Sequence, residues 1–401
     1  MIETWRTRLL KPEYRYILIF FSITFISASM ESGYYFLLPY LEGREVAIGA
    51  LGGVAMGICY GVSFFLRPFI PALEAWLGDY KVLRGGYICF FLSAVGVAFF
   101  SSNITSVVMW RGVAGLGLSM VGVALTAYER QFIPENIRGR SIALITTAYS
   151  LPSLIIVPMM EFLIVNQLYR TYIFFFPLLI AFGTVMIRKL PEINTYCPAG
   201  NAIGYNSTTS YVYLLRSPQI VLFAVSSALF ALTDAGQLTF VQLARELNLT
   251  SSYFFSVSAA TALGFRIIFG SLIDALPRKI CAAGATLITA AMMLVMTVAS
   301  SSTVLMICGV IFGIGMGFGY PAFMCLILDL GGQRYVTRLA VVFGLIYSGS
   351  FFLTPVIMEF LIAASGSAVI AYRIIYLSVL TATAVIIPVS AKIYKKKNNI
   401  I

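Results

Sequence analysis

Three charged side chains lie inside long apolar stretches of the sequence: Glu31, Arg111 and Asp234. A charge within a bilayer is energetically costly, so each of them is by default a hypothesis about function. A carboxylate beside an arginine stays ionised, whereas an unpaired carboxylate in a low-dielectric environment binds a proton more readily. The two acids and the arginine therefore predict a site that takes up and releases protons. The structural alternative is a fixed Glu31–Arg111 ion pair.

The stretches that hold these residues are long enough to cross a membrane. The chain has 401 residues, of which 60% are hydrophobic and 11% charged, and its mean hydropathy is +0.92. A soluble domain is about 45–50% apolar and about 25% charged, and a helix needs about 20 apolar residues to cross a bilayer. We predict an all-α integral membrane protein with spans near 15–40, 47–71, 83–101, 106–129, 141–164, 169–187, 218–242, 252–273, 280–300, 303–328, 339–363 and 370–391.

The placement of the basic residues gives the orientation. The net charge is +11, and with the N-terminus assigned to the cytoplasm most of the 27 Lys and Arg fall on the cytoplasmic side. This positive-inside bias predicts that both termini are cytoplasmic and argues against a nucleic-acid partner. There is no histidine, and the six cysteines show no metal-binding spacing, so we expect no metal and no cofactor. No phosphate-binding G-x-x-x-x-G-K-[ST] loop occurs either.

A polar stretch rich in Pro, Gly, Asn, Ser and Thr separates the first six spans from the last six. We predict an N-terminal six-helix bundle at 1–188, a cytoplasmic linker at 189–217 and a C-terminal six-helix bundle at 218–401. The two bundles match at an offset of roughly 200 residues, and the matches include Glu31 with Asp234, Gly33 with Gly236, Arg67 with Arg266, Tyr149 with Tyr347 and 160–164 with 358–362. This internal repeat predicts two pseudo-symmetric bundles related by an axis along the membrane normal.

Two segments resemble motifs of the major facilitator superfamily. Gly270-Ser-Leu-Ile-Asp274-Ala-Leu-Pro-Arg278-Lys279 is similar to that family's G-x-L-x-D-x-x-G-R-R motif, and Arg111-Gly-Val-Ala-Gly-Leu-Gly is similar to its R-x-x-x-G-x-G element. The first-half copy of the loop departs from the motif, because Pro71 and Ala75 stand in place of glycine and aspartate. The resemblance covers the whole chain and implies the twelve-span major facilitator fold and a transporter rather than an enzyme.

Within that superfamily, residues 36–84 are most similar to the drug-exporter-like branch, and in particular to exporters of opine metallophores such as staphylopine. The resemblance implies proton-coupled export of a small amphipathic solute, such as a siderophore, another metallophore or a drug, by alternating access. Span 5 lacks the glycines of the family's antiporter motif around Pro152 and Pro158. The alternatives are a proton-coupled importer of a nutrient, such as an amino acid or metabolite, and a non-transporting receptor or scaffold.

The resemblance also assigns roles to charged residues. It places Glu31, Asp234 and Arg111 at a central cavity, as the proton-coupling group. Residues at the cytoplasmic ends of the helices, with Asp274 paired to Arg338, are expected to form an inner gate or, for the basic ones, only to fix topology. All of them except Gly270 are charged: Arg67, Arg138, Arg140, Arg266, Gly270, Asp274, Arg278, Lys279 and Arg338. Glu161 and Glu359 either form an outer gate or reach water and headgroups. The expected partners are a small-molecule substrate, protons and the lipid bilayer, for a monomer in a bacterial inner membrane.

Overall fold

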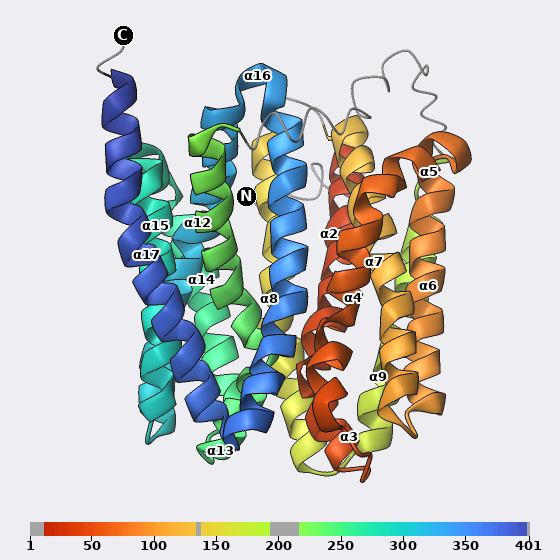
Figure 1. The fold of residues 1–401 in the computed structure, drawn as a ribbon. Coiled ribbons are helices and arrows are strands. Elements are labelled where there is room, and N and C mark those ends of the chain that lie inside the picture. Colours follow the sequence, from red (N-terminus) through yellow and green to blue (C-terminus); the bar gives the residue numbers. More distant parts are fainter. Residues whose placement is uncertain (1–11, 134–137, 193–215, 399–401) are drawn as a thin grey trace, which may run out of the picture. The chain divides into compact units, whose positions relative to one another are not determined.

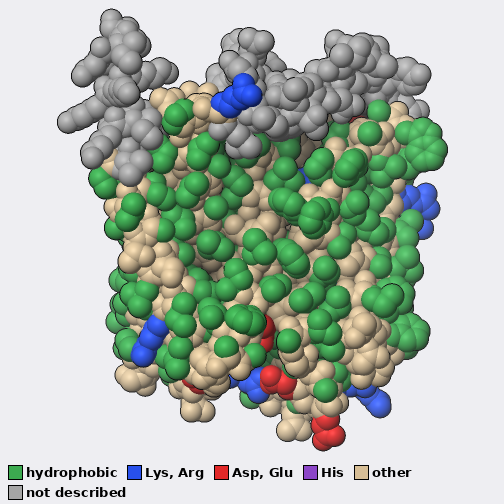
Figure 2. All heavy atoms as spheres, in the orientation of Figure 1, with side chains coloured by type: hydrophobic (Ala, Val, Ile, Leu, Met, Phe, Trp, Pro, Cys, Tyr) green, Lys and Arg blue, Asp and Glu red, His purple; other side chains and the backbone are tan. Residues whose placement is uncertain are grey.

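The computed structural model describes residues 12–133, 138–192 and 216–398. Every regular element within these ranges is a helix, and twelve helical segments are long and apolar enough to cross a membrane. The predicted all-α, twelve-span fold is therefore confirmed. Hydrophobic side chains cover most of the face shown in Figure 2. An exposed apolar surface of this extent is typical of a protein that contacts lipid.

The first unit, Met1–Cys197, contains the first six spans. In it α2 packs against α8 and α9, while α7 packs against α4 and α6, and Figure 1 shows these helices running alongside one another. Its elements, in which η marks a 3₁₀ helix, are α2 Pro12–Gly33, η1 Tyr34–Phe36, α3 Leu37–Glu42, η2 Gly49–Leu51, α4 Gly52–Leu66, η3 Arg67–Phe69, α5 Ile70–Leu77, α6 Asp79–Phe100, α7 Ile104–Phe132, α8 Arg138–Val165 and α9 Tyr169–Ile187.

The second unit, Pro198–Ile401, contains the other six spans. The boundary between the units falls inside the predicted linker 189–217, most of which lies outside the described residues. The elements of this unit are α12 Pro218–Ala235, η5 Gly236–Leu238, α13 Phe240–Glu246, α14 Ser251–Ala275, α15 Arg278–Val295, η6 Met296–Val298, α16 Ser302–Ser365 and α17 Ala368–Asn398.

One element differs from the expectation. The spans predicted at 303–328 and 339–363 belong to a single helical element, α16, which turns over at one end in Figure 1. Its two membrane-crossing parts are Ser302–Ile327 and Val341–Ser365. The two spans were predicted correctly, but the connection between them is helical rather than a loop.

The first span of each unit is interrupted directly after its acidic residue. Glu31 lies in the last turn of α2, which η1 and α3 follow, and Asp234 lies in the last turn of α12, which η5 and α13 follow. Phe36, the last residue of η1, has φ −96° and ψ 13°, and Thr239, between η5 and α13, has φ −106° and ψ 0°. A 3₁₀ stretch within a longer helix often marks a hinge. Each acid therefore stands beside a change of helix geometry.

A glycine at each interruption allows another helix of the same unit to approach closely. A Cβ added to Gly33 would lie 2.6 Å from Cε1 of Phe176 on α9, and a Cβ added to Gly236 would lie 1.7 Å from Oη of Tyr376 on α17. Real Cβ atoms do not make contacts this short, so both positions need glycine for packing.

Candidate functional site

Glu31 projects from the last turn of α2 and is held by α4. The hydroxyl of Tyr60 donates a hydrogen bond to Oε2 of Glu31, over 2.8 Å. The flanking residues Met30 and Ser32 are buried, with 2% and 5% of their surface exposed, whereas Glu31 is partly exposed. The acid is thus anchored by a neutral donor and keeps one side open.

Arg111, on α7, is buried with 2% of its surface exposed, and α4 satisfies its donors. Nε donates to the carbonyl of Ala55 over 3.3 Å, and Nη2 donates to the carbonyl of Met56 over 3.1 Å and to Sγ of Cys59 over 3.3 Å. The guanidinium carbon lies 4.4 Å from the centre of the Tyr34 ring, a cation–π arrangement. In this described part of the unit, Arg111 and Glu31 form no ion pair. The alternative of a fixed ion pair between them is therefore wrong.

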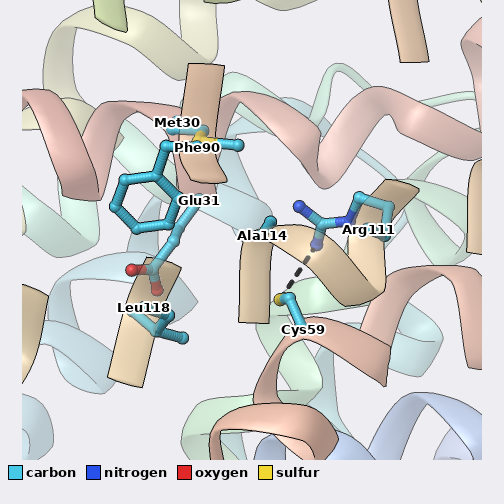
Figure 3. A pocket seen from close by; sticks show the side chains of 7 residues that line it. All are labelled: Met30, Glu31, Cys59, Phe90, Arg111, Ala114 and Leu118. Atoms are coloured by element: carbon cyan, nitrogen blue, oxygen red, sulfur yellow. Dashed lines mark hydrogen bonds between the residues drawn. The ribbon is translucent and has the colours of Figure 1, made fainter. Parts of the chain in front are cut away.

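Glu31 and Arg111 nevertheless border the same small cavity. Met30, Cys59, Phe90, Ala114 and Leu118 complete its lining, and about 10 Å³ is open to the centre of a water molecule. That volume holds about one water. Figure 3 shows the carboxylate and the guanidinium on either side of Ala114, with the carboxylate turned toward Leu118. An acid and a cation therefore share a cavity without direct contact.

Asp234 occupies the matching position in the second unit. Gln237 Nε2 donates to its Oδ1 over 2.7 Å, so its partner is again neutral. Arg266, on α14, lies close enough to attract its charge, as Arg67 does for Glu31 in the first unit. Nη2 of Arg266 donates to the carbonyl of Met316 over 3.2 Å. The sequence repeat thus extends to an acid and a nearby arginine in each half.

The residues near the outer ends differ between the units. Glu359 is buried, with 8% of its surface exposed, and accepts a hydrogen bond from Nε2 of Gln242. Little of its surface is therefore open to water or headgroups in this structure. Glu161 is partly exposed. An outer-gate role for either acid remains a prediction.

At the predicted inner gate, the structure describes only part of the charged group. Arg278 forms an ion pair with Asp329 of α16, and Lys279 is exposed. The side chains of Arg138, Arg140, Gly270, Asp274 and Arg338 lie outside the described residues, and so does the predicted Asp274–Arg338 pair. Asp329 was missed, although it lies at the end of span 10 that the sequence predicts to be cytoplasmic, among the basic residues considered.

Two tyrosines were also missed. Tyr172 of α9 donates to the carbonyl oxygen of Gly33, and Tyr372 of α17 donates to that of Gly236. The signal was present in the sequence, because these tyrosines match at the same roughly 200-residue offset as the other repeat pairs. Within the described ranges no group of three His, Cys, Asp or Glu side chains is placed to hold a metal ion.

Comparison with known proteins agrees with this fold. The family model described as Major Facilitator Superfamily matches residues 2–156, while a search of curated proteins gives no match. A POT family transporter in complex with a thioalcohol-conjugated peptide is 13% identical, with a TM-score of 0.74 over 94% of this chain and 96% of that chain. A mutant of the peptide transporter POT in complex with sulfate is 12% identical, with a TM-score of 0.76 over 95% of each chain. The inward-open xylose transporter XylE from E. coli is 12% identical, with a TM-score of 0.73 over 93% of this chain and 95% of that chain.

Identities this low show the fold alone, and this chain shares that fold with the POT family transporter and the xylose transporter. The family match covers the first four spans and part of the fifth, so it marks a similarity of that part of the chain to the Major Facilitator Superfamily.

Proposed function

We propose that the protein is a proton-coupled secondary transporter that exports a small amphipathic solute by alternating access. The observation that carries the proposal is the matched setting of Glu31 and Asp234. Each lies at the end of a broken first helix, and each has a neutral hydrogen-bond donor, Tyr60 or Gln237. Among the described side chains neither is locked in an ion pair, so each is able to change its protonation state.

Protonation has a direct consequence for a bound solute. An ionised carboxylate attracts a cationic group, and a proton on the same carboxylate removes that attraction, because binding of the proton and binding of the cation compete. Proton entry on one side and solute release on that side are then coupled. This gives antiport, the direction that the resemblance to drug and metallophore exporters implies.

Import remains the second candidate. One solved structure with the same fold is described as a D-xylose–proton symporter, and the same two acids would serve a symporter if solute and proton bound together. The two candidates differ in how proton binding affects solute binding. In an antiporter a proton displaces the solute, and in a symporter it strengthens solute binding.

The proposed solute, membrane and topology rest on the sequence. We propose a siderophore, another metallophore or a drug as the solute, on the similarity of residues 36–84 to those exporters. We propose a bacterial inner membrane with both termini cytoplasmic, on the positive-inside distribution of Lys and Arg. We propose a monomer as the working unit.

Reconstitution tests the coupling. The purified protein is placed in liposomes with an internal pH-sensitive dye, and proton flux is followed when an external solute or an opposed pH gradient is applied. We expect Glu31→Gln and Asp234→Asn each to abolish solute-dependent proton flux. Glu45→Gln, at an exposed position, is the matched control. Coupling that survives in the Glu31→Gln, Asp234→Asn double variant would contradict the proposal.

A deletion strain tests direction. Mass spectrometry of cell contents and medium compares the strain with and without the protein. Export predicts that one compound accumulates inside and disappears from the medium; import predicts that one compound stays in the medium. Secretion of iron chelators under iron limitation that is unchanged by the deletion would exclude the siderophore version.

A further inference from the structure

Four buried hydrogen-bond donors have no acceptor among the described side chains of the second unit. Nε of Arg266 on α14 and the hydroxyl of Tyr347 on α16 are both close to Asp234, and the other two donors are the hydroxyls of Thr354 and Tyr376. A buried donor left without a partner is unfavourable, so two of them near one carboxylate point to a ligand that supplies the missing acceptor. What these donors lack is an acceptor, such as a carboxylate.

Ring contacts and helical spacing place the two donors near each other and near Asp234. The Tyr347 ring lies 5.7 Å from that of Tyr320, which is one turn beyond Met316, the residue whose carbonyl accepts from Arg266. The Tyr347 ring also lies 6.5 Å from that of Phe230. Phe230 is one turn before Asp234 on α12, and residues four apart share a helix face. Tyr347 therefore lies near both Arg266 and Asp234.

The two charges at this location are opposite but held apart. Asp234 accepts from Gln237, and Arg266 donates to a main-chain carbonyl. Although Asp234 and Arg266 attract each other, these two described side chains do not form a salt bridge. A carboxylate and a guanidinium that are near each other without pairing leave both charges available to a third molecule.

Aromatic rings supply the apolar part of the surroundings. Phe343 and Phe351 have ring centres 4.8 Å and 6.0 Å from that of Tyr347. Tyr320 is 37% exposed, so the cluster reaches the surface of its unit. Ring faces of this kind favour a planar or ring-bearing group through stacked and edge-on contacts.

We propose that this cluster, Asp234, Arg266, Tyr320 and Tyr347, binds a ring-bearing solute that carries both an ammonium and a carboxylate group. The carboxylate accepts from Arg266 Nε and Tyr347 Oη, for which a planar guanidinium is well suited. The ammonium lies against Asp234, and the ring lies against Tyr320 and Tyr347. The inference names a substrate class for the proposed transporter and rests on that function only for its release step, in which a proton on Asp234 removes the partner of the ammonium.

A binding experiment without any proton gradient tests it. Calorimetry on the purified protein in lipid nanodiscs compares L-phenylalanine with phenethylamine, which lacks the carboxylate, and with 3-phenylpropanoate, which lacks the ammonium. We expect each analogue to bind at least about tenfold more weakly than L-phenylalanine, because each loses one charged contact.

Variants assign the contacts. Arg266→Gln is expected to weaken L-phenylalanine binding by about tenfold or more while leaving phenethylamine binding unchanged, and Asp234→Asn is expected to spare 3-phenylpropanoate instead. Tyr347→Phe removes only an unpartnered hydroxyl, so it should weaken L-phenylalanine binding without lowering the melting temperature. Arg170→Gln, at an exposed position in the other unit, is the matched control.

The proposal is overturned if L-phenylalanine does not bind better than both analogues, or if Arg266→Gln weakens L-phenylalanine and phenethylamine equally. Because no gradient is applied, these outcomes are distinct from failure of the proposed function. Intact proton-driven flux together with charge-independent binding would overturn the substrate class alone.

Discussion

The hydroxyl of Tyr372 donates a hydrogen bond to the carbonyl oxygen of Gly236, 2.7 Å away, at the point where α12 changes to η5. In the first unit the hydroxyl of Tyr172 makes the same bond to Gly33, over 3.0 Å, where α2 changes to η1. The last helix of each unit is thus tied to the interruption beside that unit's acid. Symmetry in the sequence is reproduced at the level of single hydrogen bonds.

Removing these hydroxyls should loosen the interruptions. We expect Tyr172→Phe and Tyr372→Phe each to lower the free energy of unfolding by about 1 kcal/mol, the net contribution of one hydrogen bond. The Tyr372 variant should be the more severe, because the hydroxyl of Tyr372 also lies 3.0 Å from Oγ1 of Thr239, and this second contact is lost with it. Thermal denaturation measures this. Proton-coupled flux should also fall when it is assayed well below the melting temperature, where the variants are folded, because the acid is no longer held in position.

Tyr253→Phe, at an exposed tyrosine of α14, is the control for these variants and should change neither quantity. Flux that remains at the wild-type level in the Tyr172→Phe, Tyr372→Phe double variant would show that the bonds serve packing only.

Alanine at the two interruption glycines should be strongly destabilising. Gly236→Ala places a Cβ 1.7 Å from Tyr376 Oη, and Gly33→Ala places one 2.6 Å from Phe176 Cε1. Overpacking of this kind lowers stability by about 1–3 kcal/mol. The melting temperature of each variant measures the effect, and adding Tyr376→Phe to Gly236→Ala should recover part of it because the nearest atom is then gone.

Gly264→Ala is the matched control, because nothing lies within 4 Å of a Cβ at that position in α14. It should be neutral or slightly stabilising, since alanine has the higher helix propensity, by about 1 kcal/mol. Equal melting temperatures for Gly236→Ala and Gly264→Ala would mean that α17 does not pack against the interruption as described.

The sequence predicted the fold well because span length and the internal repeat depend on residue type alone. It could also single out Glu31 and Asp234, since acids are rare in apolar stretches. It could not predict that Arg111 is satisfied by the carbonyls of Ala55 and Met56, because every residue has a carbonyl and only packing decides which one is near. The helical connection within α16 and the 3₁₀ breaks likewise depend on contacts from other helices, such as that of Tyr172 with Gly33.

The surroundings of Arg111 predict a separation of function from folding. Methionine has a similar length, and because Arg111 is in no ion pair with a described side chain, its replacement by an apolar side chain removes the cost of burying a charge without leaving a partner charge behind. The carbonyls of Ala55 and Met56 lie within α4 and keep their helical hydrogen bonds. We therefore expect Arg111→Met to fold, with a melting temperature close to wild type, and to lose proton-coupled flux. Arg170→Met, at an exposed position, should retain both. An Arg111→Met variant that transports normally would exclude this arginine from coupling.

The Arg278–Asp329 ion pair predicts a gate that contributes little to stability. Its effect on transport should depend on the two charges being opposite. Its side chains are 33% and 47% exposed, and exposed ion pairs contribute about 0–1 kcal/mol to stability. Asp329→Arg or Arg278→Asp alone should therefore change the melting temperature little. Each should lower transport, because two like charges then hold the helix ends apart. The double exchange Arg278→Asp, Asp329→Arg restores attraction and should restore flux in liposomes. If the double exchange is as defective as the single variants, the pair is not what matters at this end of the helices; if the single variants transport normally, the two residues only help to fix topology.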